Sequence, residues 1–462
     1  MQLLTKLTEW IVKFTTLFFI SISVSAEIQS YQLDNGLRLI IKPDHRAPVA
    51  VTQVWYGVGS SYEYNGITGI SHQLEHMMFK GTKQLAPNEF SKIIAANGGR
   101  ENAFTGRDYT AYFQTMEASR IEVSFRLEAD RMRNLVIDET ELLKERDVVA
   151  EERRLRTEDN PIAKTREAFY ASAFMNSPYH HPIVGWMADI QQYQVADLEQ
   201  WYQKWYAPNN AIIVVVGDVE PAAVFQLAQQ YFGHLSAEEV ATVKPQREVP
   251  QLGQRYTAVH APAELPYLMM GWKVPVVATA EQTWEPYALE VLASVLDGGN
   301  SARLSTELVR KQQVAATAQA SYSLFSRLDE VFIIAGIPSQ HHEISDLKQA
   351  FQAQVERLKT ELMSEAELTR IKAQVVANTV YERDSVFYQA MQIGMLATVG
   401  LDWRLSEQYV EHIQAITAEQ VQAVAKRYLI DRTLTIAELV PEAISATQSV
   451  RQVSKQGGRH AH

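Results

Sequence analysis

Cysteine is absent from the 462-residue chain. The protein therefore forms no disulfide, and it has neither a thiolate metal ligand nor a cysteine nucleophile. Basic residues are also scarce relative to acidic ones, with 43 Lys and Arg against 54 Asp and Glu and a formal net charge of −11. This acidic balance argues against a nucleic-acid partner. The hydrophobic fraction of 46% and the charged fraction of 21% are ordinary for a globular protein.

One apolar run stands near the N-terminus, at residues 14–24. Lys6 and Lys13 precede it, and Val24-Ser25-Ala26 ends it with small residues, so residues 1–26 are predicted to be a secretory signal peptide. The run is too short to span a bilayer comfortably, and we expect no stable membrane anchor, an uncleaved anchor being the alternative. An exported chain without cysteine suits the bacterial periplasm.

A helix, a turn and an apolar strand recur about 220 positions apart along the chain. The first copy runs from Val195 through Tyr206 to Val216, and the second runs from Ile416 through Tyr428. The two copies match in kind and order, though weakly residue by residue. Because the length also predicts two or three domains, we expect an α+β fold of two homologous domains, each a mainly antiparallel sheet packed with helices.

A mixed polar stretch with Pro245 and Pro250 is typical of a linker between the two domains. The predicted order along the chain is a signal peptide (1–26), an N-terminal domain (27–236), the linker (237–254), a homologous C-terminal domain (255–445) and a flexible tail (446–462).

Two histidines and a glutamate stand close together in the run His72-Gln73-Leu74-Glu75-His76. Residues three and four apart on a helix are neighbours, so His72, Glu75 and His76 share one face. Thr68 is a plausible cap for this helix. Catalytic zinc binds imidazole nitrogens, one more protein ligand and a water, and the order H-x-x-E-H marks the inverzincins. The alternative is a solvated helix face with two ordinary histidines.

The third ligand must be a carboxylate or another histidine, and a predicted helix downstream offers carboxylates. Glu145 and Glu152 fall on one stripe with Leu142 and Val149, where two carboxylates are costly without a positive partner. We predict that Glu152 is the ligand and that Glu145 orients a ligand histidine. Glu151, about 100° round the helix, is the competitor. The alternative is an exposed, salt-bridged helix, given the nearby basic residues Lys144, Arg146, Arg153 and Arg154.

These positions predict one zinc ion per chain, held by His72, His76 and Glu152 in the N-terminal domain. Glu75 then acts as the general base, taking a proton from the water that attacks a peptide carbonyl and returning it to the leaving amine. The C-terminal domain carries no such set and is predicted to lack a metal site.

Further motifs accompany this run in a fixed order. They are Gly98-Gly-Arg-Glu-Asn-Ala-Phe-Thr105 before Asp108-Tyr-Thr, then Leu127-Glu-Ala-Asp-Arg-Met132, and Tyr206-Ala-Pro-Asn-Asn with Val-Gly-Asp218. On these residues, over nearly all of the mature chain, the sequence resembles the pitrilysin/insulinase family of zinc metallopeptidases. The resemblance is to its short members, which include the mitochondrial processing peptidase β-subunit and bacterial relatives.

The resemblance implies the same three ligands, Glu75 as base and Glu145 as an assisting group. It also implies that Asn102, Ala103 and Phe104 form a sheet edge that lines the substrate, to which an extended peptide adds as a strand. For Asn102, a simple turn position is the alternative. The same resemblance implies two homologous domains per chain, and two chains or two fused halves around a closed chamber.

One region departs from the family pattern. Members that supply a substrate-contacting Arg and Tyr carry them seven residues apart, whereas this chain has Val309 and Ala316 at the matching positions. We therefore hypothesise a heterodimer in which a zinc-less homologous subunit supplies the Arg and the Tyr. The alternative is a local shift that lets Arg310 and Tyr322 serve, although one residue on a helix turns the side chain by about 100°.

The sequence thus predicts an exported zinc endopeptidase that cleaves peptides or unfolded segments inside a closed chamber. A non-catalytic peptide-binding or assembly subunit is the alternative from a different class. The intact set of predicted ligands and base favours the enzyme, because a site that has lost its function usually loses ligands.

Overall fold

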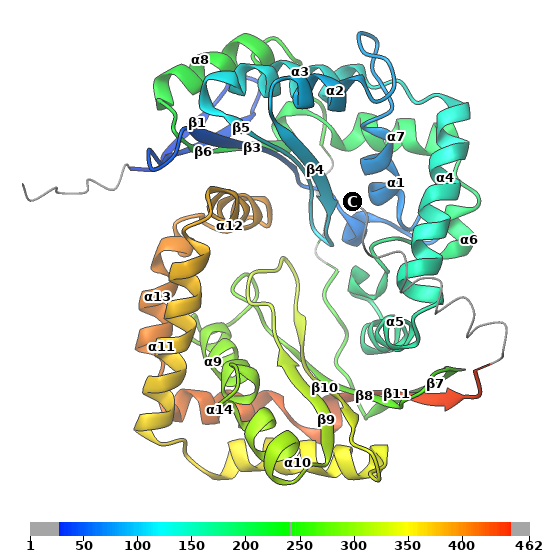
Figure 1. The fold of residues 1–462 in the computed structure, drawn as a ribbon, viewed down its shortest axis with the longest axis vertical. Coiled ribbons are helices and arrows are strands. Elements are labelled where there is room, and N and C mark those ends of the chain that lie inside the picture. Colours follow the sequence, from blue (N-terminus) through cyan, green and yellow to red (C-terminus); the bar gives the residue numbers. More distant parts are fainter. Residues whose placement is uncertain (1–26, 241–242, 245, 445–462) are drawn as a thin grey trace, which may run out of the picture.

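Groups of strands and groups of helices follow one another along both halves of the computed structural model, which describes residues 27–240, 243–244 and 246–444 (Figure 1). The predicted signal peptide and the predicted tail lie outside these residues. Within the described ranges, no helix combines the length and the apolar character that a membrane crossing requires.

The first half of the chain forms a six-stranded sheet in the order β1-β2-β6-β3-β5-β4. Its strands are β1 (Gln29–Gln32), β2 (Arg38–Pro43), β3 (Val49–Tyr56), β4 (Arg100–Thr105), β5 (Thr110–Glu117) and β6 (Ala211–Gly217). β2 pairs parallel with β6, and the other neighbours are antiparallel. The valine-rich β6 is buried along its whole length, as both faces of the sheet are covered. β4 is an edge strand.

The second half forms a five-stranded sheet in the order β7-β11-β8-β10-β9. Its strands are β7 (Arg255–Pro262), β8 (Tyr267–Val274), β9 (Ala315–Ser321), β10 (Glu330–Pro338) and β11 (Leu434–Glu442). In both sheets the first and last strands of the repeated unit pair parallel, and the remaining pairs are antiparallel. The order β2-β6-β3-β5-β4 thus repeats in the second sheet. The predicted α+β fold of two similar domains is confirmed.

Eight helices of the described chain belong to the first half and six to the second. The first set is α1 (Ile70–Met77), α2 (Glu89–Ala96), α3 (Ile121–Asn134), α4 (Glu139–Arg153), α5 (Pro161–Ala173), α6 (Met187–Ile190), α7 (Val195–Trp205) and α8 (Pro221–Phe232). The second set is α9 (Glu285–Asp297), α10 (Ile344–Thr360), α11 (Glu365–Glu382), α12 (Val386–Thr398), α13 (Leu405–Ala415) and α14 (Ala418–Tyr428).

The two halves exchange one helix each. α5, from the first half, packs on the second sheet, where Phe169 lies against β8 so closely that a Cβ on Gly271 would meet its ring at 2.5 Å. α12, from the second half, packs on the first sheet, where a Cβ on Gly394 would meet the Trp55 ring at 2.2 Å. Figure 1 shows α12 beneath the first sheet and α5 above the second. Each sheet therefore completes its apolar layer with residues of the other half.

Candidate metal centre

The start of α1 fixes the predicted zinc-binding run in space. The prediction that Thr68 caps this helix is wrong, because the helix begins after Gly69. The Thr68 hydroxyl donates to Asp189 at 2.5 Å. The backbone N–H groups of Gly69 and Ser71 donate instead to the Glu63 carboxylate at 2.5 and 2.9 Å. A carboxylate accepts such bonds more strongly than a hydroxyl does, so it replaces the expected cap.

His72, His76 and Glu152 bring three candidate ligand atoms together. His72 Nε2 lies 3.7 Å from Glu152 Oε2, and His76 Nε2 lies 3.5 Å from the same oxygen. The ligand atoms of all three lie within 4.8 Å of one another, and no other group of three such residues qualifies in the part of the chain described here. Ligands of a tetrahedral zinc ion are separated by about 3.3–3.4 Å. The donor set and its spacing therefore fit zinc.

The carboxylates of Glu145 and Glu152 favour a positive charge beside the two imidazoles. Burial opposes a charge on His76, but hydrogen bonds to Glu145 and Glu152 outweigh it and raise the pKa of His76 to about 9. Burial, followed by the charge of His76, lowers the pKa of His72. The hydrogen bond with His76 lowers the pKa of Glu152 and keeps it an anion. A positive charge is thus stabilised where a metal would lie.

Glu145 contacts the other side of His76. Its Oε2 lies 3.1 Å from His76 Nδ1, and its Oε1 pairs with Lys80 Nζ at 2.6 Å. His76 Nε2 faces Glu152, so the ring proton lies on Nδ1. The Nδ1–H group donates a hydrogen bond to Glu145, and this bond orients the ring. The structure therefore places Glu145 beside His76. His72 Nδ1 is buried and finds no hydrogen-bond partner among the described residues.

Glu151 and Glu152 point in different directions from α4. The Glu151 side chain is 58% exposed and pairs with Arg154. Glu152 directs Oε2 at the two histidines, while its Oε1 pairs with Arg156 at 2.6 Å. The geometry therefore separates the predicted ligand from its competitor.

Glu75 lies beside the ligands and at the end of the edge strand. Its side chain is buried, which raises the pKa of Glu75. Thr105, the last residue of β4, donates its hydroxyl to Glu75 Oε2 at 2.5 Å. A buried carboxylate with a raised pKa is suited to accepting a proton.

The predicted substrate segment lies within β4 rather than in a turn. Asn102, Ala103 and Phe104 pair on one side with β5, and their other side is the sheet edge. The Phe104 ring packs edge-on against Trp55 with centroids 5.3 Å apart. Trp55 therefore helps to hold the strand in place, and no described strand pairs with its outer side. The Ala103 N–H of this segment already donates to Asn102 Oδ1 at 2.8 Å, so an added strand would have to form its bonds with the other backbone groups.

The two helices that carry the ligands are anchored on one loop. Arg153, next to Glu152 on α4, is buried and donates to the carbonyl oxygen of Gly185 at 2.7 Å and to Glu167 at 2.9 Å. Gly185 has a φ of +86°, and a Cβ there would lie 2.1 Å from the oxygen of Thr68, just before α1. The loop thus fixes the distance between α1 and α4.

Arg153→Lys is expected to weaken zinc binding about tenfold, the low end of what changes around metal ligands cost. Lysine keeps the charge but loses the planar fork that contacts Gly185 and Glu167 together. Competition with a chromophoric chelator measures the affinity. Arg154→Lys, on the exposed side of the same helix turn, is the matched control. Equal affinities for both variants would contradict the anchoring role of Arg153.

Sequence reasoning missed four of the residues that support this centre. The spacing of Arg156 from Glu152 is the i,i+4 signal that marks helix neighbours, whereas Lys80 lies beyond the end of α1 and pairs with Glu145 of α4. Thr105 and Glu63 reach the site through the fold, and no spacing in the sequence indicates either contact.

Converging imidazoles and a carboxylate, with a second buried carboxylate beside them, define a candidate metallohydrolase centre. Residues 38–185 match the model described as insulinase, peptidase family M16, and residues 192–375 match the M16 peptidase inactive domain. The chain belongs to the M16 peptidase family, and it is a zinc protease of that family.

Individual relatives agree with this membership. The chain is 34% identical to the zinc protease PqqE of Helicobacter pylori over 382 residues, covering 80% of this chain and 85% of that protein. A crystal structure of a protease from Helicobacter pylori superimposes with a TM-score of 0.85 at 32% identity, over 90% of this chain and all of that one. The periplasmic protease PqqL of Escherichia coli shares the fold, with a TM-score of 0.76 at 18% identity. That match covers 94% of this chain and 50% of PqqL.

Proposed function

We propose that this chain is an exported endopeptidase and the zinc-bearing subunit of a heterodimer, which cleaves peptides or unfolded segments in a closed chamber. The observation that carries the proposal is the convergence of His72, His76 and Glu152 beside Glu75. The free edge of β4 ends at the same place, through Thr105. Ligands, a base and a peptide-binding edge thus meet at one point.

In this proposal the side chains divide the work of peptide hydrolysis. A zinc ion held by the three ligands supplies a Lewis acid for the scissile carbonyl and the attacking water. Glu75 takes the water's proton on Oε1, since Oε2 already accepts the Thr105 hydroxyl, and returns it to the leaving amine. Glu145 keeps the His76 ring oriented. The extended substrate pairs with the backbone of residues 102–104.

A partner subunit is proposed because the candidate Arg and Tyr of this chain are engaged elsewhere. Arg310 donates to the carbonyl oxygen of Asn300 and, at 2.9 Å, to Thr306. The Tyr322 hydroxyl donates to the oxygen of Pro275 at 2.6 Å. These contacts support a zinc-less homologue as the source of both groups. The predicted signal peptide supports the periplasm as the location, the compartment for which PqqL is named.

The test is zinc content and peptide cleavage by the mature chain, alone and mixed with a zinc-less homologue from the same organism. The expected result is one zinc per chain, with turnover at least about tenfold higher in the mixture, because groups that position the substrate contribute to the rate. Full activity of the chain alone would contradict the heterodimer but not the peptidase. Stoichiometric zinc with no cleavage under either condition would contradict the peptidase.

A further inference from the structure

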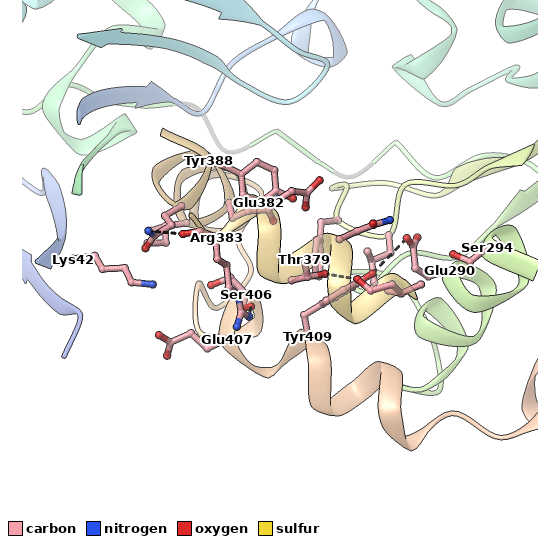
Figure 2. A pocket seen from close by; sticks show the side chains of 17 residues that line it. Lys42, Glu290, Ser294, Thr379, Glu382, Arg383, Tyr388, Ser406, Glu407 and Tyr409 are labelled. Carbon is pink, nitrogen blue, oxygen red and sulfur yellow. Dashed lines mark hydrogen bonds between the residues drawn. The ribbon is translucent and has the colours of Figure 1, made fainter. Parts of the chain in front are cut away.

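A pocket of about 320 Å³ lies apart from the metal centre, where the two halves meet (Figure 2). Its lining comes from α9, α11, α12 and α13 of the second half, together with Lys42 on β2 of the first half. Its volume falls within the range of pockets that hold small ligands. An occupant would therefore contact both halves of the chain.

One end of the pocket holds a carboxylate without a basic partner. Glu290 accepts a hydrogen bond from the Tyr409 hydroxyl at 3.5 Å. Among the described residues, no Lys, Arg or His nitrogen forms an ion pair with it, and Tyr409 is the one side chain that influences the charge of Glu290 by a hydrogen bond. Burial raises the pKa of Glu290 to about 7. A partly buried carboxylate in this setting is stabilised by a cation that enters the pocket.

The opposite end holds basic groups, as Figure 2 shows for Lys42 and Arg383. The Lys42 ammonium group makes no hydrogen bond or ion pair with the described residues, and burial is the main cause that lowers the pKa of Lys42. Arg383 uses one Nη to donate to the carbonyl oxygen of Ser406 at 2.6 Å. Glu407 also lies at this end and offsets one of the two positive charges, which leaves a net positive charge for an anion.

The walls between the two ends combine rings and apolar side chains. Tyr388, Tyr409 and Phe325 line the pocket with Leu324 and Ile393. The Tyr388 hydroxyl bonds to Glu382 and accepts from Gln392, so the third carboxyl group of the lining, Glu382, already has a partner. Aromatic faces near a carboxylate favour a bound ammonium group.

We propose that this pocket binds a short peptide with free ends, its ammonium group at Glu290 and its carboxylate at Lys42 and Arg383. The two unpaired charges lie at opposite ends, and a zwitterion of this kind neutralises both at once. The site is separate from the zinc centre, so this proposal does not depend on the function proposed above.

The test is calorimetric titration of trialanine into the zinc-loaded full chain carrying Glu75→Gln, which prevents hydrolysis of the probe. We expect saturable binding that weakens at least tenfold when Glu290→Gln is added, and equally when the peptide is N-acetylated. The two losses of affinity should not add when the changes are combined, because both changes remove the same contact between the ammonium group and Glu290. C-terminal amidation of the peptide and Lys42→Gln should each weaken binding in the same way, and these two losses should not add either, because both remove the contact between the peptide carboxylate and Lys42.

Glu411→Gln is the matched control, because Glu411 lies on α13 with Tyr409 but is exposed and outside the pocket lining. Trialanine affinity that is unchanged by Glu290→Gln and Lys42→Gln, or lowered equally by Glu411→Gln, would overturn the proposal. Failure to detect saturable binding, or equal affinity for free alanine, would overturn it too. The N-acetylated peptide tests the ammonium contact without any substitution at Glu290. The proposal can therefore still be tested if the Glu290→Gln variant fails to fold.

Discussion

Glu75→Gln is expected to retain one zinc per chain and to lose about 10²–10⁴ of the peptide turnover, the usual contribution of a general base. The amide keeps the size of the side chain and can still bond to Thr105, but it cannot take up a proton at neutral pH. The two ligand histidines and Glu152 are untouched. Metal analysis and initial rates on a fluorogenic peptide measure the two quantities on the same preparation.

Loss of zinc together with activity in this variant would mean that Glu75 supports the fold of the site rather than the chemistry. Thr105→Val provides a graded comparison, because it removes the hydroxyl that holds Glu75 while leaving the carboxylate. Its turnover is expected to fall by less than that of Glu75→Gln. Wild-type turnover for Glu75→Gln would exclude the assigned base.

Glu152→Gln is expected to lower zinc affinity by at least about 100-fold, the upper end for changes that only surround the ligands. A neutral amide is a poor zinc ligand, and the substitution removes the negative charge that faces both histidines at 3.5 and 3.7 Å. Competition with a chelator of known affinity gives the dissociation constant. Addition of excess zinc should restore part of the activity if the fold is intact.

Glu151→Gln is the matched control for this substitution, because it changes the neighbouring carboxylate on the exposed side of α4. Zinc affinity and turnover should remain at wild-type values. A large loss in this variant with none in Glu152→Gln would transfer the ligand role to Glu151 and would require α4 to be turned by about 100°.

The helix period explains how much of the site could be predicted. His72 and His76 are four apart, and Glu145 and Glu152 are seven apart, so each pair is placed by local geometry alone. Their meeting is not local, since it needs α1 and α4 to be anchored on the loop at Gly185. The sequence indicated that Glu145 and Glu152 approach the histidines only because two carboxylates on an apolar helix stripe need a positive partner.

Contacts that cross between elements were beyond the sequence patterns. Thr68 has the right residue type for a cap, but Glu63 accepts the N–H bonds at the start of the helix, and the Thr68 hydroxyl donates to Asp189 instead. The two-domain α+β fold follows from the repeated strand and helix patterns, whereas the exchange of α5 and α12 leaves no periodic signal. Periodicity reports which face of a helix is apolar, not which sheet that face covers.

The exchanged helices also bear on how the chain is made. The apolar face around Trp55 is complete only when α12 arrives, about 340 residues later in synthesis, which at ordinary rates takes tens of seconds. During that time the face of the first sheet that α12 covers is exposed to water, where chaperones can bind it and aggregation can begin. We expect the first half of the chain to mature only after the second half has emerged.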